Sequence, residues 1–350
     1  VSDGTILYDS AGVMPTDSAF IGTMVAASNG TIYFYNGIAW NAVDSAETIV
    51  PPLPLGTQAQ GTISGYTSGG VLPAITDAID KFPFTSDANA TDVGDLSIAR
   101  YRSAGQSSTT NGYTGGGSAP AGSNVIDKFP FSVDANATDV GDLTGSRYSM
   151  AGQNSTDNGY SSGGIIPSYT NIIDKFPFSS DANATDVGNL SITRGFVHGQ
   201  SSTDNGYTSS GFFSPPASYR NQIDKFPFTS DTNATDVGDV TVARYGGAGQ
   251  SSSTHGYTSG GFDPSPVTTN DVIDKFPFAS DANATDVGDL TVERYYMAGQ
   301  SSSVSGYTTG GSTPNPALNI IEKFPFSTDT NATDVGDMSV NRTNVAGQQV

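Results

Sequence analysis

The sequence predicts an all-β fold made of six similar sheet units, and three observations support this. A phrase close to "IDKFPF" recurs six times, starting at Ile79, Ile126, Ile173, Ile223, Ile273 and Ile321. Successive copies are 47, 47, 50, 50 and 48 residues apart, a period typical of repeated structural units. The 350 residues also include 42 Gly, 18 Phe and 16 Tyr, regularly spaced, as expected for short strands joined by tight turns.

Each unit contains four expected elements in the same order. "GYTSGG" or a variant predicts a short strand, and its Gly pair permits close packing or a positive φ. "VIDKF" predicts a strand that ends near the Pro of "KFPF", because Pro lacks a backbone N–H. "SDANATDVGDL" predicts a turn and a further strand, since Asp and Asn stabilise turns. "AGQSS" predicts the strand that leads into the next unit.

The two ends of the repeat region predict a closed ring. The last unit runs on through "RTNVAGQQV", which corresponds to the strand preceding "GYTSGG" elsewhere, whereas the first unit has only a blurred copy near Gln58–Gly61. We therefore expect the C-terminal strand, about Asn344–Gln349, to complete the sheet that begins at Gly65. Such closure removes open sheet edges and predicts a six-bladed β-propeller.

The unit resembles the kelch repeat over roughly residues 60–350. In that repeat a strand ends in a Gly pair, an aromatic strand follows, and an Arg leads to the next unit; Gly69-Gly70, Phe82 and Arg100 match these positions. The chain departs from the pattern because "ATDVGDL" stands where a Trp is usual, and its single Trp is Trp40. The resemblance implies a propeller of kelch-like architecture.

Two sets of recurring side chains are expected to join the blades. We expect aromatic packing between blades from Phe82, Phe129, Phe176, Phe226, Phe276 and Phe324. We expect bonds to carbonyls, or to the turn Asp residues of a neighbouring blade, from Arg100, Arg147, Arg194, Arg244, Arg294 and Arg342. With six Lys in the "IDKFPF" phrases, these Arg account for 12 of 14 basic residues, leaving Arg102 and Arg220.

The acidic turn segment has two interpretations. Asp87, Asn89 and Asp92 loosely imitate the start of a calcium loop, but the central Gly and the distal Glu of an EF-hand are missing. Hydrogen-bonded turn chemistry is the preferred interpretation, with structural calcium as the alternative. No other cofactor is expected.

The units differ most between the Gly pair and the next "IDKFPF". Segments 165–172, 212–222 and 262–272 are the longest or most aromatic, and variable loops on a rigid scaffold are common recognition sites. The residues singled out as recognition candidates are Tyr169, Phe212, Phe213, Tyr219, Arg220, Phe262 and Asp263. Relaxed constraint on exposed loops is the alternative explanation.

The composition argues against several functions. A net charge of −20 and a pI near 4.1 disfavour nucleic acid and anionic membranes as partners, and no apolar run is long enough to span a bilayer. The chain has no Cys, and its two His, His198 and His255, are expected to be exposed substitutions rather than catalysts. "STDNGYTS" only imitates the start of a sialidase-type turn. We therefore expect no enzyme activity.

The N-terminal part differs from the repeats. Residues 1–50 contain "NGTIYFYNGIAWNAV", which predicts a β-hairpin, and "PPLPLG" opens a stiff linker over 51–60 before the propeller at 61–350. The hairpin resembles those in fibre and appendage proteins of tailed bacteriophages, and the repeat phrase resembles proteins of marine cyanophages and related phages.

This resemblance implies a non-enzymatic structural protein on the surface of a phage virion, as a tail fibre, appendage or decoration. Its N-terminal segment would bind other virion proteins, and its propeller would contact a host-surface glycan or protein. A secreted bacterial glycan-binding protein is the alternative, and a propeller enzyme is the least favoured hypothesis.

Overall fold

The computed structural model describes three short strands of the N-terminal segment and residues 60–350, apart from 72, 265, 266 and 315. The chain divides into two compact units, Val1–Leu55 and Gly56–Val350. In the first unit, antiparallel strands β1 (Met24–Ala26), β2 (Ile32–Tyr35) and β3 (Trp40–Val43) form one sheet in the order β1-β2-β3. The predicted Pro-rich linker lies outside the described residues except for Gln60.

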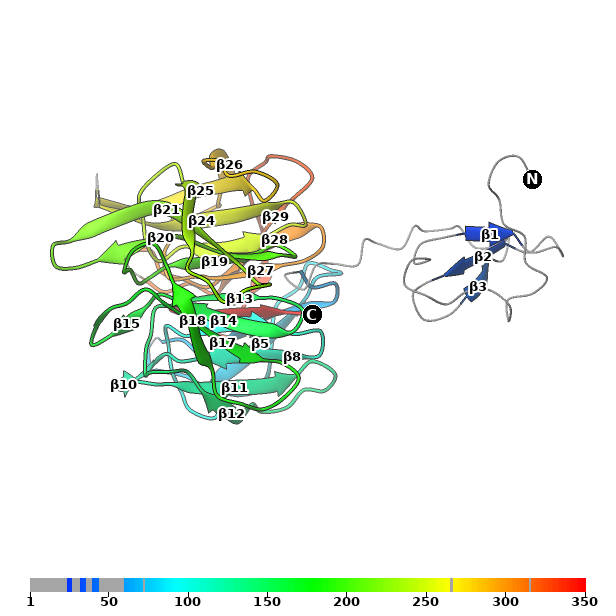
Figure 1. Ribbon diagram of the computed structural model, residues 1–350, viewed down its shortest axis with the longest axis horizontal. Helices are drawn as coiled ribbons and strands as arrows, with labels where there is room; N and C mark the ends of the chain where they lie inside the picture. Colours follow the sequence, from blue (N-terminus) through cyan, green and yellow to red (C-terminus); the bar gives the residue numbers. More distant parts are fainter. Residues whose placement is uncertain are drawn as a thin grey trace. The chain divides into compact units, whose positions relative to one another are not determined.

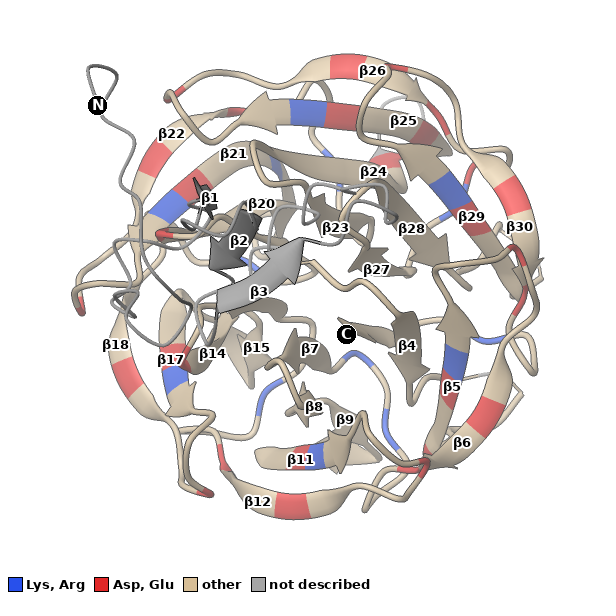
Figure 2. Ribbon diagram, turned by 90° about the vertical axis from the view of Figure 1, so that its right-hand side faces the viewer, with Lys and Arg blue, Asp and Glu red and all other residues tan. Residues whose placement is uncertain are grey.

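The second unit is a six-bladed β-propeller, as the repeats predict, and each blade is a four-stranded antiparallel sheet (Figures 1 and 2). From the axis outward, blades 1 to 6 are β31-β4-β5-β6, β7-β8-β11-β12, β13-β14-β17-β18, β19-β20-β21-β22, β23-β24-β25-β26 and β27-β28-β29-β30.

The four strands of each blade correspond to the four recurring phrases. The inner strands, from "AGQS", are β7 (Ala104–Ser107), β13 (Ala151–Asn154), β19 (His198–Ser201), β23 (Ala248–Ser251), β27 (Ala298–Ser301) and β31 (Ala346–Gln349). The second strands, from "GYTSGG", are β4 (Ser64–Ser68), β8 (Asn111–Gly115), β14 (Asn158–Ser162), β20 (Asn205–Phe213), β24 (His255–Pro264) and β28 (Ser305–Thr309).

The two outward strands follow in the same way. The third strands, from "IDKFP", are β5 (Ala78–Pro83), β11 (Val125–Pro130), β17 (Ile172–Pro177), β21 (Ser218–Pro227), β25 (Val267–Pro277) and β29 (Ile320–Pro325). The outer strands, from "TDVGD", are β6 (Thr91–Asp95), β12 (Thr138–Asp142), β18 (Thr185–Asn189), β22 (Thr235–Asp239), β26 (Thr285–Asp289) and β30 (Thr333–Asp337). Short extra hairpins are formed by β9 (Ser118–Ala119) with β10 (Ala121–Gly122), and by β15 (Ile165–Ile166) with β16 (Ser168–Tyr169).

The C-terminal strand closes the ring, which confirms the prediction from the chain ends. β31 pairs antiparallel with β4, from Ala346↔Ser68 to Gln349↔Gly65, and so supplies the inner strand of blade 1. Residues from opposite ends of the repeat region therefore share one sheet, and the inner edge of β4 is paired.

Glycine sets how closely the inner strands approach the axis. A Cβ built on Gly105 would lie 2.2 Å from the carbonyl oxygen of Gly347 in the neighbouring inner strand, and the equivalent Gly of the other inner strands lie 2.1 to 2.3 Å from theirs. Any larger residue would push adjacent blades apart. The Gly of "AGQS" is therefore explained by backbone contact around the axis.

The hydrophobic core lies between blades. Tyr66 of blade 1 packs against Phe129 and Phe131 of blade 2, with ring centroids 5.5 and 4.9 Å apart. The buried Ile79 and Leu96 of blade 1 belong to the same cluster, and five equivalent clusters complete the ring. Each buried Phe of this kind contributes roughly 1.5–3 kcal/mol, so the "KFPF" phrase is a structural device repeated at every interface.

Two glycine positions allow this packing. A Cβ on Gly65 would lie 2.3 Å from the ring of Phe82, so the Gly of "GYT" makes room for the aromatic side chain of the adjacent strand. The Gly pair that ends the second strand takes positive φ, 63° at Gly69 and 114° at Gly70, as expected from the sequence. Blade 4 places Ser210 at the first of these positions with φ of 59°.

The repeated Arg residues form fully buried ion pairs across the blade interfaces. Arg100 Nη2 lies 3.1 Å from Asp127 Oδ2 of the next blade and donates to the carbonyl of Thr114 at 2.7 Å. The bond to a carbonyl was expected from the sequence, but the carboxylate comes from the "IDKFPF" phrase and not from the acidic turn, which was the other expected partner. The other pairs are Arg147–Asp174, Arg194–Asp224, Arg244–Asp274, Arg294–Glu322 and Arg342–Asp80.

Candidate ligand-binding surface at the variable end of the propeller

The two ends of the propeller are made from different kinds of connection. Gly115, the last residue of β8, is opposite Ala104, the first residue of the inner strand β7. Connections from the second to the third strand therefore lie at the same end as connections from the outer strand to the next inner strand. We call this the variable end. The opposite turn end holds the acidic turns and Ser64, where the chain enters β4.

Long hairpins extend the variable end in blades 4 and 5. β20 and β21 pair as far as Phe213↔Ser218, and β24 and β25 as far as Pro264↔Val267, beyond the usual second and third strands. These hairpins project at the left of Figure 1, away from the C-terminus. Segment 165–172 of blade 3 contains the short β15–β16 hairpin.

The structure brings most of the recognition candidates into one aromatic cluster. Tyr169 of blade 3 lies with its ring centroid 5.7 Å from Phe212 and 5.6 Å from Phe213 of blade 4. Phe212 in turn packs at 5.0 Å on Tyr219. Phe262 of blade 5 joins through Tyr245, which is 5.4 Å from Phe262 and 5.6 Å from Phe212. All of these side chains are half-buried.

The two charged candidates lie in the long hairpins beside this cluster. Arg220 is in β21 opposite Gly211, and its Nε is buried with no hydrogen-bond partner. Asp263 is in β24 opposite Thr268, and its charge acts on the buried Arg244.

Sequence reasoning missed the second half of the cluster, which follows the repeated Arg residues. Tyr245, Tyr295, Tyr296 and Phe196 all lie one or two positions after such an Arg. Tyr245 packs 5.4 Å from Phe196 and 6.0 Å from Tyr296, and Tyr295 packs 5.7 Å from Phe262. Comparing the units at the second position after each Arg could have found Phe196 and Tyr296, because six different amino acids stand there.

Those six positions form a closed backbone ring at the mouth of the central channel. We call it the axial ring; its members are Arg102, Ser149, Phe196, Gly246, Tyr296 and Asn344. Each backbone N–H donates to the carbonyl of the preceding member around the ring, for example Arg102 to Asn344 and Ser149 to Arg102, both at 2.8 Å. Every member has a left-handed φ between 56° and 68°. The scaffold thus holds six backbones alike while their side chains differ.

Arg102 occupies an unusual place in the axial ring. Its Nε donates to Asn344 Oδ1 at 3.2 Å. Its guanidinium carbon lies 5.0 Å from the ring centroid of Phe196 and 5.5 Å from that of Tyr296. A third ring, Tyr101, is 5.4 Å away. The guanidinium is therefore surrounded by aromatic faces, which attract a cation.

The nearby phenols are neutral near pH 7, and burial moves their pKa further from it. Desolvation raises the pKa of Tyr296 and of Tyr245, although the positive charge of Arg102 opposes this shift in both. These side chains thus offer hydroxyl groups and aromatic faces but no negative charge near neutral pH.

The candidate calcium residues each have a separate protein partner. Asp87 Oδ1 accepts from Lys323 Nζ at 2.5 Å, and Asn89 Oδ1 accepts from the backbone N–H of Asp337 at 3.1 Å. Asp92 Oδ1 weakly accepts from the N–H of Gly94 at 3.3 Å. Across the described residues, no group of three or more acidic or His side chains could hold a metal ion.

The expectation that both His are exposed was wrong for His198. This residue replaces the Ala of "AGQ" in β19 and is only 3% exposed; its Nε2 accepts from the N–H of Gly247 at 2.6 Å. Desolvation by burial, assisted by the charges of Arg244 and Arg194, lowers its pKa to about 3. His255 lies at the turn end, half-buried, with Nδ1 2.8 Å from Thr254 Oγ1.

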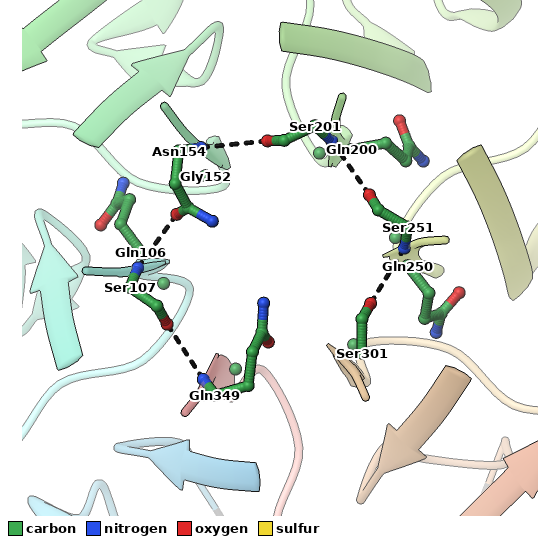
Figure 3. Close-up of a pocket in the computed structure, with 15 residues that line it drawn as sticks. Gln106, Ser107, Gly152, Asn154, Gln200, Ser201, Gln250, Ser251, Ser301 and Gln349 are labelled. Atoms are coloured by element: carbon green, nitrogen blue, oxygen red, sulfur yellow. Dashed lines mark hydrogen bonds between the residues drawn. The ribbon is translucent and has the colours of Figure 1, made fainter. Parts of the chain in front are cut away.

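The central channel is narrow and polar. A cavity of about 50 Å³ on the axis is lined mainly by Gly, Gln and Ser of the inner strands. In Figure 3, backbone N–H groups donate to the side chains of the next blade, as in Ser107 to Asn154 at 3.0 Å and Asn154 to Ser201 at 3.0 Å. The polar groups that line the channel are thus largely engaged in holding inner strands together.

The comparisons with known proteins add no family: no family model and no curated protein matches this chain. Within the part of the chain that the structure describes, no helix is long and apolar enough to cross a membrane.

Proposed function

We propose that this chain is a non-enzymatic structural protein of a tailed-phage virion, whose propeller displays a binding surface for a host-surface glycan or protein. One observation carries the binding role. The six units repeat nearly the same sequence at every interface, and their differences collect at the variable end as one aromatic surface. Selection for folding alone would not require Tyr169, Phe212 and Tyr245 to meet there.

The rigid ring supports this role mechanically. The blades are held together by buried ion pairs, aromatic clusters and the closing strand. The loops at the variable end are therefore anchored on a rigid scaffold before any ligand binds. A surface that is already organised loses less entropy on binding. Tyr and Phe also provide large contact areas from side chains with few rotatable bonds.

The virion assignment rests on sequence resemblance. "NGTIYFYNGIAWNAV" resembles hairpins of phage fibre and appendage proteins, and the repeat phrase resembles proteins of marine cyanophages and related phages. In this proposal the N-terminal unit binds other virion proteins. The chain enters the propeller at the turn end, and we assign host contact to the opposite, variable end.

A binding role is favoured over catalysis by the engagement of the ionisable groups. The buried carboxylates of "IDKFPF" form ion pairs with Arg, and the Lys of the same phrase pair with turn Asp residues. General acid–base catalysis needs an asymmetric cluster with tuned pKa values. The chain instead repeats one structural arrangement around the axis.

The binding role can be tested by labelling the full chain and measuring its attachment to candidate host cells. We expect a Phe213→Ser, Tyr219→Ser double variant to lose attachment. The control is Val133→Ser, Val304→Ser, which removes two side chains that are 59% and 60% exposed at the turn end. Thermal melting would verify that both variants are folded. Equal attachment by both variants would refute a binding role for the variable end.

The virion assignment needs a separate experiment. A mass-spectrometric inventory of density-purified particles should contain this chain in a fixed ratio to the major capsid protein. Detection only in the particle-free medium would favour the alternative, a secreted bacterial glycan-binding protein.

A further inference from the structure

We propose that Arg102, with Phe196 and Tyr296, forms a site for the carboxylate of an acidic saccharide at the axial mouth of the variable end. The inference rests on the proposed binding function and specifies its ligand class. It arises from three features that meet at one point: a cation with no carboxylate partner among the described residues, a preformed recess, and an aromatic surface leading away from it.

The charge of Arg102 is exceptional in this protein. All six Lys, and the six Arg that recur in the units, lie within ion-pair distance of an Asp or Glu. Within the described part of the chain, Arg102 and Arg220 have no such partner. Only Arg102 lies on the propeller axis. A guanidinium left without a carboxylate in a chain of net charge −20 is available to a carboxylate from outside.

The geometry leaves the two terminal nitrogens of Arg102 available to donate to a carboxylate. Arg102 is oriented through Nε, which donates to Asn344 Oδ1, and through the rings of Phe196 and Tyr296. Its two terminal nitrogens make no hydrogen bond within the described residues. Those nitrogens form the planar fork that binds a carboxylate through two parallel hydrogen bonds.

A recess lies next to this fork. It has a volume of about 70 Å³ and is lined by members of the axial ring, including Ser149, together with Met150 and Met297. Since about 10–15 Å³ of such space holds one water molecule, the recess has room for a carboxylate beside the fork. The rest of the ligand would extend over the surrounding surface.

That surface suits a saccharide. From Tyr296 the aromatic rings continue through Tyr245 to Phe262 and Phe212, with neighbouring centroids 5.4 to 6.0 Å apart. Aromatic faces carry partial negative charge and attract the polarised C–H groups on one side of a sugar ring. The neutral phenols supply hydroxyl groups for hydrogen bonds. A peptide would also require partners for its backbone N–H and C=O groups.

A polyanion with dense phosphates is disfavoured. One available Arg on the axis, in a protein with 34 acidic residues, gives little attraction for a phosphate chain, which is held by clustered basic side chains. A saccharide that presents one carboxylate to Arg102 and uncharged groups to the aromatic surface matches the charge present.

The test measures binding of the full chain to an array of carboxylated saccharides, including hexuronic and nonulosonic acids, with the methyl ester of each as a neutral match. Calorimetry with oligogalacturonate and an oligoglutamate peptide would follow. Arg102→Ser introduces the residue type that the axial ring already has at Ser149. The backbone φ is 58° at Ser149 and 59° at Arg102, so a serine fits the backbone conformation at position 102. Lys81→Ser removes the same charge from a third strand, away from the axis, and serves as the control.

We expect carboxylated saccharides to bind while their esters do not, and Arg102→Ser to weaken binding by about 10- to 100-fold, as for a lost charge-assisted hydrogen bond. Arg102→Lys should be intermediate, because it keeps the charge and loses the fork. Lys81→Ser should bind as the unaltered chain does.

Three results would overturn the inference: no signal from any carboxylated saccharide, equal binding of acids and esters, or binding of oligoglutamate alone. Attachment to cells that depends on Phe213 and Tyr219, without any saccharide signal, would overturn the ligand class and leave the proposed function standing. Saccharide binding that depends on Arg102, with cell attachment unaffected by the variable end, would support the ligand class and refute the host-binding role.

Discussion

Asp127→Ala tests whether the buried ion pairs hold adjacent blades together. Asp127 and Arg100 are both fully buried, and they join blade 2 to blade 1 at 3.1 Å. Asp127 Oδ2 also accepts from the backbone N–H of Ser97 at 2.9 Å. The substitution would leave Arg100 with one hydrogen bond, to the carbonyl of Thr114, while its Nε and Nη1 already have no partner among the described residues.

The size of the effect follows from the burial of the remaining charge. Removing one partner of a buried ion pair costs about 3–5 kcal/mol of the free energy of unfolding, because the other charge stays desolvated and uncompensated. For a propeller of about 290 residues, an unfolding entropy of ~2.1 cal/mol/K per residue converts this loss into a fall of ~5–8 °C in the melting temperature.

The same interface provides a matched control. Lys81 and Asp134 also join blades 1 and 2, with Nζ and Oδ1 2.9 Å apart, but their side chains are 30% and 56% exposed. Water and salt screen such a pair, so Asp134→Ala should cost only about 0–1 kcal/mol. Both substitutions remove one carboxylate, which keeps the change in net charge equal.

Differential scanning calorimetry and urea unfolding at pH 7 would measure the two variants side by side. Raising the salt concentration should reduce the small effect of Asp134→Ala and leave that of Asp127→Ala nearly unchanged. Equal losses in the two variants, or a loss below about 1 kcal/mol for Asp127→Ala, would refute the reasoning that burial decides the value of these pairs.

Three further predictions concern the axis and the closure. Gly105→Ala should destabilise the protein by ~1–3 kcal/mol, because its Cβ would lie 2.2 Å from the carbonyl oxygen of Gly347. Gly115→Ala is the control, since the nearest atom to its Cβ would be 3.5 Å away. Equal denaturation curves for the two variants would contradict the close contact. Removing residues 344–350 deletes β31 and exposes the edge of β4, so calorimetry should show a markedly lower melting temperature; an unchanged value would mean that the ring is not closed as described. Because burial lowers the pKa of His198 to about 3, below its ordinary 6.5, the unfolded chain gains a proton as pH falls below 6.5 and the folded protein does not. The free energy of unfolding should therefore fall by up to ~1.4 kcal/mol per pH unit in that window, and His198→Ala should lose this contribution between pH 7 and pH 5 in urea titrations; the same pH dependence in both proteins would argue against a buried neutral His198.

The fold was predictable because each blade repeats the same local signals. Turn residues, the Gly pair and the alternating "IDKF" pattern define each strand, and their recurrence predicts six blades. The closing strand was predictable because its phrase is displaced from the first unit to the chain end. The expectation that His198 is exposed was wrong. His198 replaces the Ala of "AGQ" in one unit only, and such a single substitution does not show from the sequence whether the side chain is buried.

The binding surface was only partly predictable. Phe212, Tyr219 and Phe262 stand out because they lie in long divergent loops. Arg102 and Tyr296 lie in short connections between nearly invariant phrases, where a difference of one residue attracts little notice. They contribute to the binding surface because those connections meet at the propeller axis, and the local sequence does not reveal that position.

By itself, the sequence determined the number of blades, the order of strands within them and the closing role of the C-terminal strand. All of these follow from local patterns and their period. Only the tertiary structure decided that each repeated Arg pairs with the Asp or Glu of the next blade's third strand, and that Arg102, Phe196 and Tyr296 meet on the axis. The physical reason is the closed ring: it places equivalent positions of distant units side by side, so residues far apart in the chain form one surface.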